Sequence, residues 1–464
     1  MSAPRVAVVG GGLAGITAAL DCAAAGARVT LVEVRRRLGG AAYSFEREGM
    51  RLDNGQHVFL RCCSAYRALL ARLGSERHVE VQERLEIPVL SPGKPPVTLR
   101  RGTLPPPLHL AGALARYPHL SAAQRFSAAL AARALSALDT SDLALDERTL
   151  GDWLSDLGQS ERSLAALWDL IALPTLNLPA KEASLALGAF VFQTGLLASA
   201  DAGDIGFHVG TLADAIGDPA ERALADAGVE YRLGWRAQAL RRVEGGFELQ
   251  AGWGGREDGQ DAQEQGDRAG EGLSAEAVIV ALPHARAAGL IEPLLPRQAE
   301  AIRGLGSSPI VNLHVVYDRV VCEQHFAAGV DTPVQYLFDR SAAAGAPPGC
   351  QYLAVSLSGA EREMQASVAE LRERYLPAIA ELLPGAREAR VESFLATREH
   401  TATFRAAPGT AALRPGAATE VPGLALAGTW TATGWPATLE SAVMSGHAAA
   451  RAALGQVAPE AVGA

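Results

Sequence analysis

The sequence predicts an α/β protein built around a Rossmann-like nucleotide-binding domain, and three stretches of the chain predict it. Near the N-terminus the apolar strand Arg5–Val9 runs into a Gly-x-Gly-x-x-Gly turn, and a second strand, Val29–Glu33, follows the intervening helix. Later, Ala277–Pro283 is an apolar run typical of a buried parallel strand. Finally, Leu424–Gly428 leads through a polar turn into a helix of small residues. We expect one nucleotide-binding domain assembled from these stretches, with a second domain inserted between them.

The glycine turn predicts where the phosphates of a dinucleotide lie. Gly10 permits the tight turn, Gly12 lets the backbone approach a pyrophosphate, and Gly15 lets the helix pack closely on the strand. Leu13 and Ala14 open the helix, whose N-terminal amides and dipole favour negative charge. The structural alternative is a strand–helix–strand unit that binds nothing.

Glu33, at the end of the second strand, predicts which dinucleotide fits. Its carboxylate is placed to accept hydrogen bonds from the two hydroxyls of an adenosine ribose. The same charge repels a 2′-phosphate, which favours FAD or NAD over NADP. Val34 and Arg35 follow directly and complete the predicted ribose end of the site.

Composition limits the classes of partner. The 464 residues suffice for two or three cooperating subdomains, and 48% apolar with 20% charged residues is ordinary for a soluble enzyme. A net charge of −9 argues against nucleic acid as a partner. The five cysteines show neither metal-ligand spacing nor a disulfide framework, so we expect no metal. Because no signal peptide or membrane span is evident, we expect a cytoplasmic protein.

The order of expected elements divides the chain into five segments. We expect a short helix near 64–74, strands at 79–99, a mainly helical region at 104–225 that includes 121–138, strands again at 229–250, and a strand at 310–321. The segments are 1–75, 226–300 and 411–464 for the nucleotide-binding domain, 76–225 for a substrate domain with a helical cap, and 301–410 for a substrate-domain sheet.

The glycine fingerprint, the doublet Gly39-Gly40 and the C-terminal strand–glycine–helix together resemble the FAD-dependent phytoene desaturase and amine oxidase superfamily. The resemblance implies FAD and an FAD-binding domain of the glutathione-reductase type, with an inserted α+β substrate domain and a helical cap. It implies that the doublet approaches the flavin side of the pyrophosphate and that Val229 contacts the adenine. It places Gly428, Thr429, Thr438 and Leu439 against the flavin and its ribityl chain.

Two further stretches, Asp53–His57 and Gly434–Val443, resemble the hydroxysqualene dehydroxylases, with supporting matches at Ile310–His314 and Ala402–Phe404. This narrower resemblance implies a linear C30 isoprenoid alcohol as substrate, squalene as product, an unidentified electron donor and a place in squalene and hopanoid biosynthesis. The chain departs from the family at Thr429, where an aspartate is usual, which lowers the expected affinity for FAD.

Loss of the substrate hydroxyl requires a proton donor, and the motifs contain three candidates: Asp53, His57 and Glu440. A carboxyl group that is buried has a raised pKa and can act as an acid. Each candidate also has a structural alternative. Asp53 can cap a turn, His57 can pack in the interior, and Glu440 can bind the free amides of a helix N-terminus.

Two other activities remain open alongside the dehydroxylase. A carotenoid or isoprenoid desaturase would share the fold and run the redox step in the oxidising direction. A flavin amine oxidase typically uses a lysine near the flavin, and this chain has no lysine after Lys181. The stretch Leu104–Leu110, with Tyr117 nearby, is either a loop crossing between subdomains or a patch that contacts the inner membrane surface.

Overall fold

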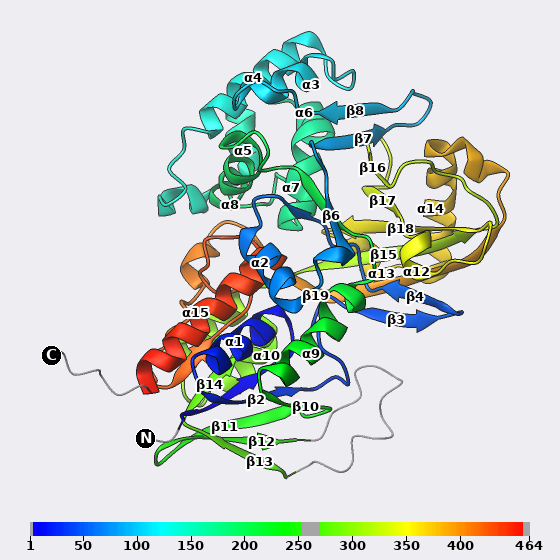
Figure 1. Ribbon diagram of the computed structural model, residues 1–464. Coiled ribbons are helices and arrows are strands. Elements are labelled where there is room, and N and C mark those ends of the chain that lie inside the picture. Colours follow the sequence, from blue (N-terminus) through cyan, green and yellow to red (C-terminus); the bar gives the residue numbers. More distant parts are fainter. Residues whose placement is uncertain (1–2, 253–269, 458–464) are drawn as a thin grey trace.

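A parallel sheet of five strands forms the lower part of the molecule in Figure 1, the computed structural model, which describes residues 3–252 and 270–457. The strand order is β10-β2-β1-β14-β20, and each neighbouring pair is parallel. Four of the five strands come from the three stretches that the sequence singled out, and one comes from the strand region expected at 229–250. These strands are β1 (Arg5–Val9), β2 (Arg28–Glu33), β10 (Glu230–Leu233), β14 (Ala277–Val280) and β20 (Leu424–Leu426).

Both faces of this sheet are covered, so alternate residues of a strand enter different cores. Val6 and Val8 of β1 pack toward helices, whereas Ala7 and Val9 pack toward the opposite layer. The first layer holds α1 (Leu13–Ala24), α2 (Ser64–Leu73), α9 (Asp218–Asp226) and α15 (Leu439–Val457). The second holds β11 (Ala237–Val243), β12 (Gly246–Ala251), β13 (Gly272–Ala275), α10 (His284–Ile291) and α11 (Pro296–Gly304).

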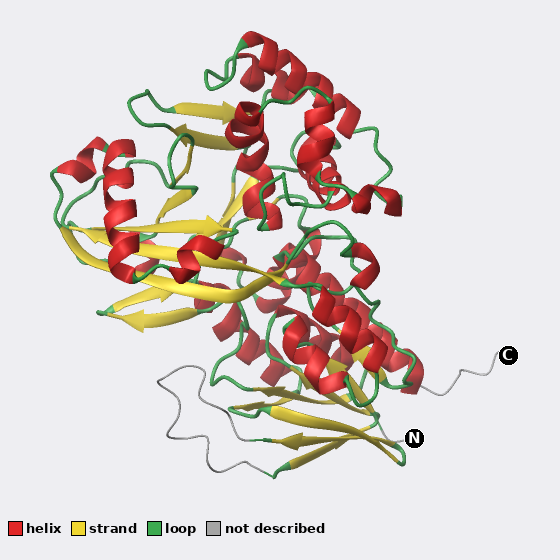
Figure 2. Cartoon of the chain, turned by 180° about the vertical axis from the view of Figure 1, so that it is seen from behind, coloured by secondary structure: helices red, strands yellow, loops and turns green. Residues whose placement is uncertain are grey.

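A second sheet, of seven strands, carries the inserted part of the chain. Its order is β19-β15-β18-β17-β16-β7-β8, with β16 and β7 parallel and the other pairs antiparallel. Helix α14 (Val368–Leu382) lies across it, as Figure 2 shows. The strands are β7 (Glu86–Leu90), β8 (Val97–Arg100), β15 (Ser307–Tyr317), β16 (Phe326–Gly329), β17 (Tyr336–Asp339), β18 (Gln351–Ser358) and β19 (Val391–Phe404).

Short helices form a cap above this sheet. The helix expected over 121–138 is α4 (Ala122–Leu135), and Ser121 caps it, because the serine hydroxyl accepts from the Gln124 amide at 3.3 Å. The other cap helices are η2 (Leu108–Leu110), α3 (Ala111–Ala115), η3 (Leu143–Glu147), α5 (Leu150–Asp156), α6 (Glu161–Ser163), η4 (Leu164–Trp168), α7 (Asp169–Leu176), α8 (Leu185–Phe192) and η5 (Gln193–Leu197).

The region expected to be mainly helical also contains a strand, β9 (Ile205–His208), which pairs with β5 (Phe59–Leu60) and β6 (Val79–Val81). Asp204 precedes it and is fully buried, accepting bonds from Arg61 at 3.0 Å and from Arg101 at 2.7 Å. Burial alone would raise the pKa of Asp204, but the two arginines outweigh it and lower the pKa. This buried carboxylate ties the cap to the rest of the chain.

The fold class expected from the sequence is confirmed: a parallel α/β nucleotide-binding fold with an inserted α+β part and a helical cap. The boundaries of the five segments stay a prediction. In the described part of the chain, no helix combines the length and the apolar character that crossing a bilayer requires.

We predict opposite effects for two glycine substitutions within α15. The Cβ of Gly446→Ala would lie 2.4 Å from the Ala14 carbonyl oxygen, so this change should lower the free energy of unfolding by about 1–3 kcal/mol. Nothing lies within 4 Å of the Cβ position at Gly455. Gly455→Ala should therefore leave stability unchanged or raise it by up to about 1 kcal/mol. Urea unfolding followed by circular dichroism measures both, and equal effects would contradict close packing of the two helices.

Candidate active site

The glycine turn lies at the carboxyl edge of the five-stranded sheet, where backbone approaches backbone. Gly10 has φ +114°, and a Cβ there would lie 2.3 Å from the Ala281 carbonyl oxygen. A Cβ at Gly15 would lie 1.9 Å from the carbonyl oxygen of Gly10. Gly12 is the N-cap of α1 and supplies no side-chain cap, so the first amides of the helix stay available to an anion.

The doublet Gly39-Gly40 lies directly beside this turn. Gly12 and Gly39 form an isolated parallel bridge, and a Cβ at Gly40 would lie 2.7 Å from the Cα of Gly12. Arg37 donates from Nη1 to the Gly40 carbonyl at 3.2 Å and stacks on Tyr43, 3.5 Å from the ring centroid. Its Nη2 is buried without a partner. A buried guanidinium with an unused donor beside two glycine turns fits a pyrophosphate.

Glu33 ends β2 and is 7% exposed. Its carboxylate accepts from the amide of Gly11 at 2.6 Å and from the amide of Arg35 at 2.8 Å. The carboxylate therefore lies between the glycine turn and the chain that leaves β2, with Val34 beside it. Val229, expected near the adenine, is buried immediately before β10, the strand that pairs with β2.

The C-terminal candidates lie between β20 and α15. Gly428 has φ +139°, and half-buried Thr429 follows it with no partner for its hydroxyl among the described residues. The hydroxyl of Thr438 accepts from the Ser441 amide at 3.2 Å and caps α15, which begins at Leu439. Since β1 and β20 are parallel, the N-termini of α1 and α15 both face the carboxyl edge of the sheet.

Sequence reasoning missed Arg414, which organises the loop between β20 and α15. Its Nη2 donates to the carbonyl oxygens of Thr429 at 3.1 Å, Thr431 at 2.6 Å and Trp435 at 2.7 Å. Burial lowers the pKa of Arg414 to about 10, and Asp146 opposes that effect. The guanidinium is still charged at neutral pH. No motif marks it, because its partners are backbone carbonyls.

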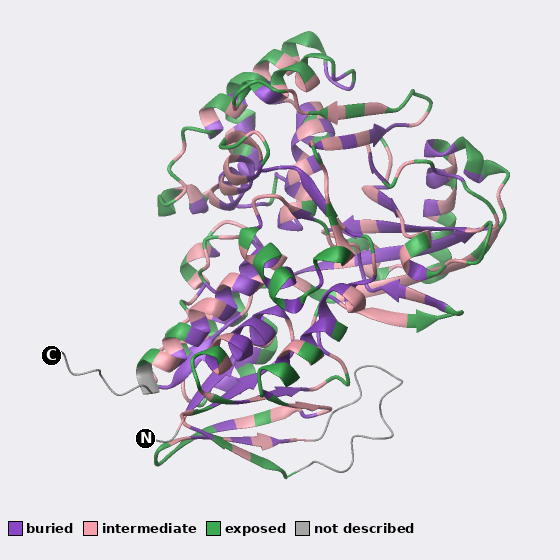
Figure 3. Cartoon of the chain, in the orientation of Figure 1, coloured by how far each residue is buried: buried purple, intermediate pink, exposed green. Residues whose placement is uncertain are grey.

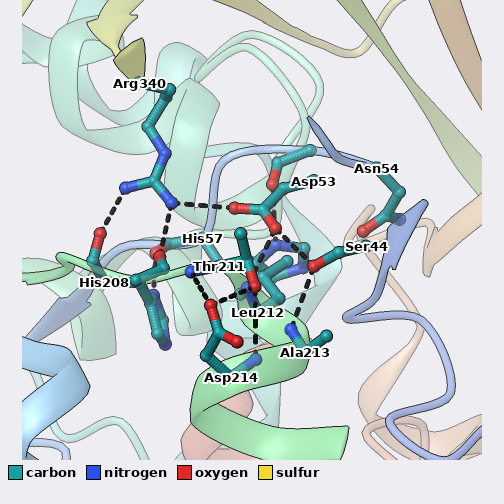
Figure 4. Close-up of polar contacts among 12 residues, drawn as sticks. Ser44, Asp53, Asn54, His57, His208, Thr211, Leu212, Ala213, Asp214 and Arg340 are labelled. Atoms are coloured by element: carbon teal, nitrogen blue, oxygen red, sulfur yellow. Dashed lines mark hydrogen bonds and ion pairs between the residues drawn. The ribbon is translucent and has the colours of Figure 1, made fainter. Parts of the chain in front are cut away.

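Asp53 lies at the junction of the sheet, the cap and the inserted sheet, as Figure 4 shows. It ends β4 (Met50–Asp53) and is 4% exposed. Its oxygens accept from the Ser44 hydroxyl at 2.7 Å, from the Leu212 amide at 2.9 Å and from Arg340 at 2.9 Å. The carboxylate thus serves as an anchor, which is the capping alternative, and has no oxygen aimed at open space.

Arg340, the partner of Asp53, also holds the segment after β9. It donates to the carbonyl oxygen of His208 and, at 2.7 Å, to that of Gly210. Because Arg340 belongs to the inserted sheet, one guanidinium joins three parts of the chain. Arg340 was not predicted from the sequence, since an isolated arginine matches no motif.

Glu440, on the first turn of α15, binds the start of another helix. Its two oxygens accept from the amides of Ala65 at 2.9 Å and Tyr66 at 2.7 Å, which lie in the first turn of α2. A carboxylate at a helix N-terminus satisfies free amides and the helix dipole. The geometry is that of the structural alternative.

His57 is the third candidate, and its ring keeps an open nitrogen. Nδ1 lies 3.2 Å from the Gly55 carbonyl oxygen, which assigns the proton to Nδ1, while Nε2 has no hydrogen-bond partner within the described ranges. Burial lowers the pKa of His57 below its usual value of 6.5. The ring is therefore mostly neutral at pH 7.

The buried side chains of His208 and Tyr66 link His57 to α2, the helix whose N-terminal amides bind Glu440. The ring of His208 donates from Nδ1 to the His57 carbonyl oxygen at 2.8 Å, and its Nε2 accepts from the Tyr66 hydroxyl at 2.7 Å. Burial lowers the pKa of His208 to about 3, so this ring stays neutral. His57 and Glu440 are thus both bonded to the pair of His208 and Tyr66, which the sequence did not single out, and Asp53 is linked to that pair through Arg340.

Two motifs that carried the resemblance meet at Asn54. Its backbone carbonyl oxygen accepts from the side chains of Asn312 at 3.0 Å and Thr397 at 2.8 Å. Its side-chain amide donates from Nδ2 to the carboxylate of Glu399 at 2.8 Å. Strand β15 therefore positions the segment that contains His57. In the described ranges, no group of three His, Cys, Asp or Glu side chains is arranged to hold a metal ion.

Comparison with known proteins identifies the family of the chain. Over residues 13–454 the chain matches the family model described as flavin containing amine oxidoreductase. It is 27% identical to the hydroxysqualene dehydroxylase of Zymomonas mobilis, covering 96% of this chain and 98% of that protein. It is 29% identical to the hydroxysqualene dehydroxylase of Rhodopseudomonas palustris, covering 96% and 97%.

Among solved structures, cyclohexylamine oxidase from Brevibacterium oxydans superposes with a TM-score of 0.71 at 19% identity, covering 98% of this chain and 99% of that one, which shows a shared fold. The family match confirms the expected oxidoreductase and its flavin, and the unit around Glu33 suits the ADP half of FAD. The chain belongs to the family of flavin containing amine oxidoreductases.

Proposed function

We propose that the protein is a hydroxysqualene dehydroxylase of squalene and hopanoid biosynthesis. One observation carries the proposal: similarity to enzymes of that name runs along 96% of this chain and at least 97% of theirs. The motifs that carried the narrower resemblance also meet in space at Asn54 and Asn312. The proposed substrate is hydroxysqualene, a linear C30 allylic alcohol, and the product is squalene.

The reaction exchanges a hydroxyl group for hydrogen. One proton and one hydride enter, the carbon–oxygen bond breaks, and squalene and water leave. The hydride would come from FAD, when the cofactor is bound in its reduced form. The protein must orient an apolar chain, protonate the leaving oxygen, and exclude water that would otherwise capture an allylic cation.

For the cofactor we propose that Glu33 binds the ribose hydroxyls and that the open N-terminus of α1 binds the pyrophosphate. Two observations support this assignment. The turns at Gly12 and Gly40 carry no side chain, and Nη2 of Arg37 has no hydrogen-bond partner among the described residues. The residues proposed to hold FAD are Gly10, Gly12, Leu13, Ala14, Gly15, Glu33, Val34, Arg35, Gly39, Gly40, Val229, Gly428, Thr429, Thr438 and Leu439.

For the proton we propose His57 in preference to Asp53 and Glu440. The oxygens of both carboxylates are occupied by amides, a hydroxyl or a guanidinium. His57 alone keeps an open position, at Nε2. Protonated at Nε2, it would donate to the leaving oxygen.

We further propose that the protein works in the cytoplasm at the inner membrane surface, because a C30 isoprenoid dissolves in lipid rather than in water.

Neither of the two lysines supports the alternative activity of an amine oxidase. Lys94 pairs with Asp331, and Lys181 pairs with Glu161.

We predict that Glu33→Ala weakens FAD binding by roughly 1.5–3 kcal/mol, because a charge-assisted hydrogen bond to the ribose is lost. Turnover per bound FAD should change little. Titration of apoprotein with FAD, followed by flavin fluorescence, measures the dissociation constant. Glu230→Ala, an exposed acid on the neighbouring strand β10, is the matched control. An unchanged dissociation constant for Glu33→Ala would place Glu33 away from the ribose.

We predict that His57→Gln lowers kcat by about 100-fold or more, the usual contribution of a general acid. In the unsubstituted protein kcat should fall as pH rises, because the acid form of His57 predominates only below its lowered pKa. His57→Gln should abolish that pH dependence. His325→Gln, far along the chain in the inserted part, is the control. A variant that keeps the pH profile would exclude His57 as donor.

We predict that the reduced protein is the form that acts on hydroxysqualene, since the reaction is a two-electron reduction. Anaerobic single-turnover mixing should yield one squalene per reduced flavin, measured by gas chromatography with mass spectrometry. Oxidised protein is the control and should leave hydroxysqualene unchanged. If the reduced form is inert and the oxidised form makes squalene or phytoene more unsaturated, the protein is a desaturase.

A further inference from the structure

A long acid-free segment runs through the cap. From Lys94 to Leu138 the chain contains six lysine and arginine residues and no aspartate or glutamate, in a protein whose net charge is −9. Three of the six are neutralised by acids elsewhere, which are Asp331 for Lys94, Glu86 for Arg100 and Asp204 for Arg101. The remaining three, Arg116, Arg125 and Arg133, have no acidic partner in the part of the chain that the structure describes.

Exposed apolar side chains lie on the same segment. Leu104 is 56% exposed, Leu108 58%, Phe126 68% and Leu130 54%. We call these four residues, together with Arg116 and Arg133, the cap tip. Isolated exposed leucines are ordinary in proteins, but four large apolar side chains within one acid-free segment form a patch.

Helix α4 presents part of this patch, Phe126 and Leu130, to solvent. Its buried residues, Ala128, Ala131 and Leu135, form one face. With 100° between successive residues, Phe126 and Leu130 lie on the opposite face, one turn apart, and Arg133 lies beside them. A second apolar face with an adjoining cation is the pattern of a helix that rests on a lipid surface.

The other members of the cap tip are neighbours of α4. Helix η2, which contains Leu108, packs on α3, and α3 packs on both α4 and β8. Arg125 donates from Nη1 to the carbonyl oxygen of Ala115 at the end of α3, and the backbone amide of Gly102 donates to the carbonyl oxygen of His109 at 2.6 Å. Figures 1 and 3 show α3 and α4 at the end of the molecule remote from the five-stranded sheet, largely exposed.

Tyr117 does not belong to the patch, although the sequence suggested it. It is fully buried, and its hydroxyl donates to the Ala166 carbonyl at 2.6 Å. Tyr117 instead holds the segment between α3 and α4 against the body of the cap. The exposed residues are therefore presented on a fixed support.

We propose that the cap tip docks on the surface of an anionic lipid bilayer. The uncompensated arginines would meet lipid headgroups, and the four apolar side chains would enter the boundary with the acyl chains. An otherwise acidic chain would be oriented by this one basic end. The inference deepens the proposed function and rests on it for its purpose, because a bilayer is where a C30 substrate resides. Vesicle binding itself requires no substrate.

The test is sedimentation of the FAD-loaded protein with vesicles of phosphatidylcholine containing phosphatidylglycerol. Wild-type protein should bind these vesicles, release with added salt, and bind pure phosphatidylcholine weakly. Phe126→Ser with Leu130→Ser should lower the partition coefficient by at least about tenfold, since each side chain loses its apolar burial. Arg116→Gln with Arg133→Gln should lower it by about tenfold or more and remove most of the salt dependence.

Matched controls lie away from the cap tip. Val320→Ser with Val368→Ser removes exposed apolar side chains of the inserted sheet part, and Arg222→Gln with Arg297→Gln removes exposed arginines beside the parallel sheet. Both should bind vesicles as the wild type does. Every variant should keep its flavin absorbance and its turnover of detergent-solubilised hydroxysqualene, which separates docking from catalysis.

Three outcomes would overturn the proposal. They are absence of binding to anionic vesicles, equal binding by the cap-tip variants and the wild type, and a change of oligomeric state in the Phe126→Ser, Leu130→Ser variant, measured by light scattering. The last would assign the patch to contact between copies of the chain. Failure of turnover with vesicle binding intact would instead count against the proposed function alone.

Discussion

The close contact of α1 with β1 on one side and with α15 on the other is the constraint on which the rest of the structure depends. Gly15 lets α1 approach the turn at Gly10, and Gly446 lets α15 approach the Ala14 carbonyl, at distances that no Cβ would permit. At these two contacts the backbones meet with no Cβ of the glycine between them. Because β1 and β20 are parallel, this arrangement brings two helix N-termini to the same sheet edge, where the candidate residues gather.

The inserted parts meet that edge through buried polar contacts, in addition to an apolar core that runs from the parallel sheet into the cap. Arg340 joins Asp53 to the segment around His208, and Asn312 holds the carbonyl of Asn54. A hydrogen bond fixes direction as well as distance, whereas apolar contact tolerates sliding. Removing either partner would leave a buried charge or carbonyl unpaired, which is costly in a low-dielectric interior. The segment that ends at His57 is therefore fixed from both sides.

What the sequence could predict follows from how local each signal is. The glycine turn, Glu33 and the α15 region are recognisable because each lies within one short unit whose pattern has a direct physical cause. Arg414 and Arg340 were not predictable, since most of their partners are backbone carbonyls, which any residue supplies, and since Asp53, the acid that pairs with Arg340, lies far away in the sequence. The four-residue strand β9 was hidden inside a helical region because its pairing partners lie more than a hundred residues away. For Asp53 and Glu440 the sequence left two alternatives, a proton donor or a structural anchor, and their bonding suits the anchor.

Exclusion of water from the site links its electrostatics with the proposed chemistry. The burial that would protect an allylic cation from water also disfavours charge on the imidazoles, and so it lowers the pKa of both His57 and His208. A lowered pKa makes the protonated ring rarer and, at the same time, a stronger acid. Both ring nitrogens of His208 are hydrogen-bonded, so its imidazole stays neutral and holds the segment around His57 in place. For His57, with Nε2 open, the same burial favours rapid release of a proton once one is bound, which suits a leaving hydroxyl that must depart before the hydride arrives.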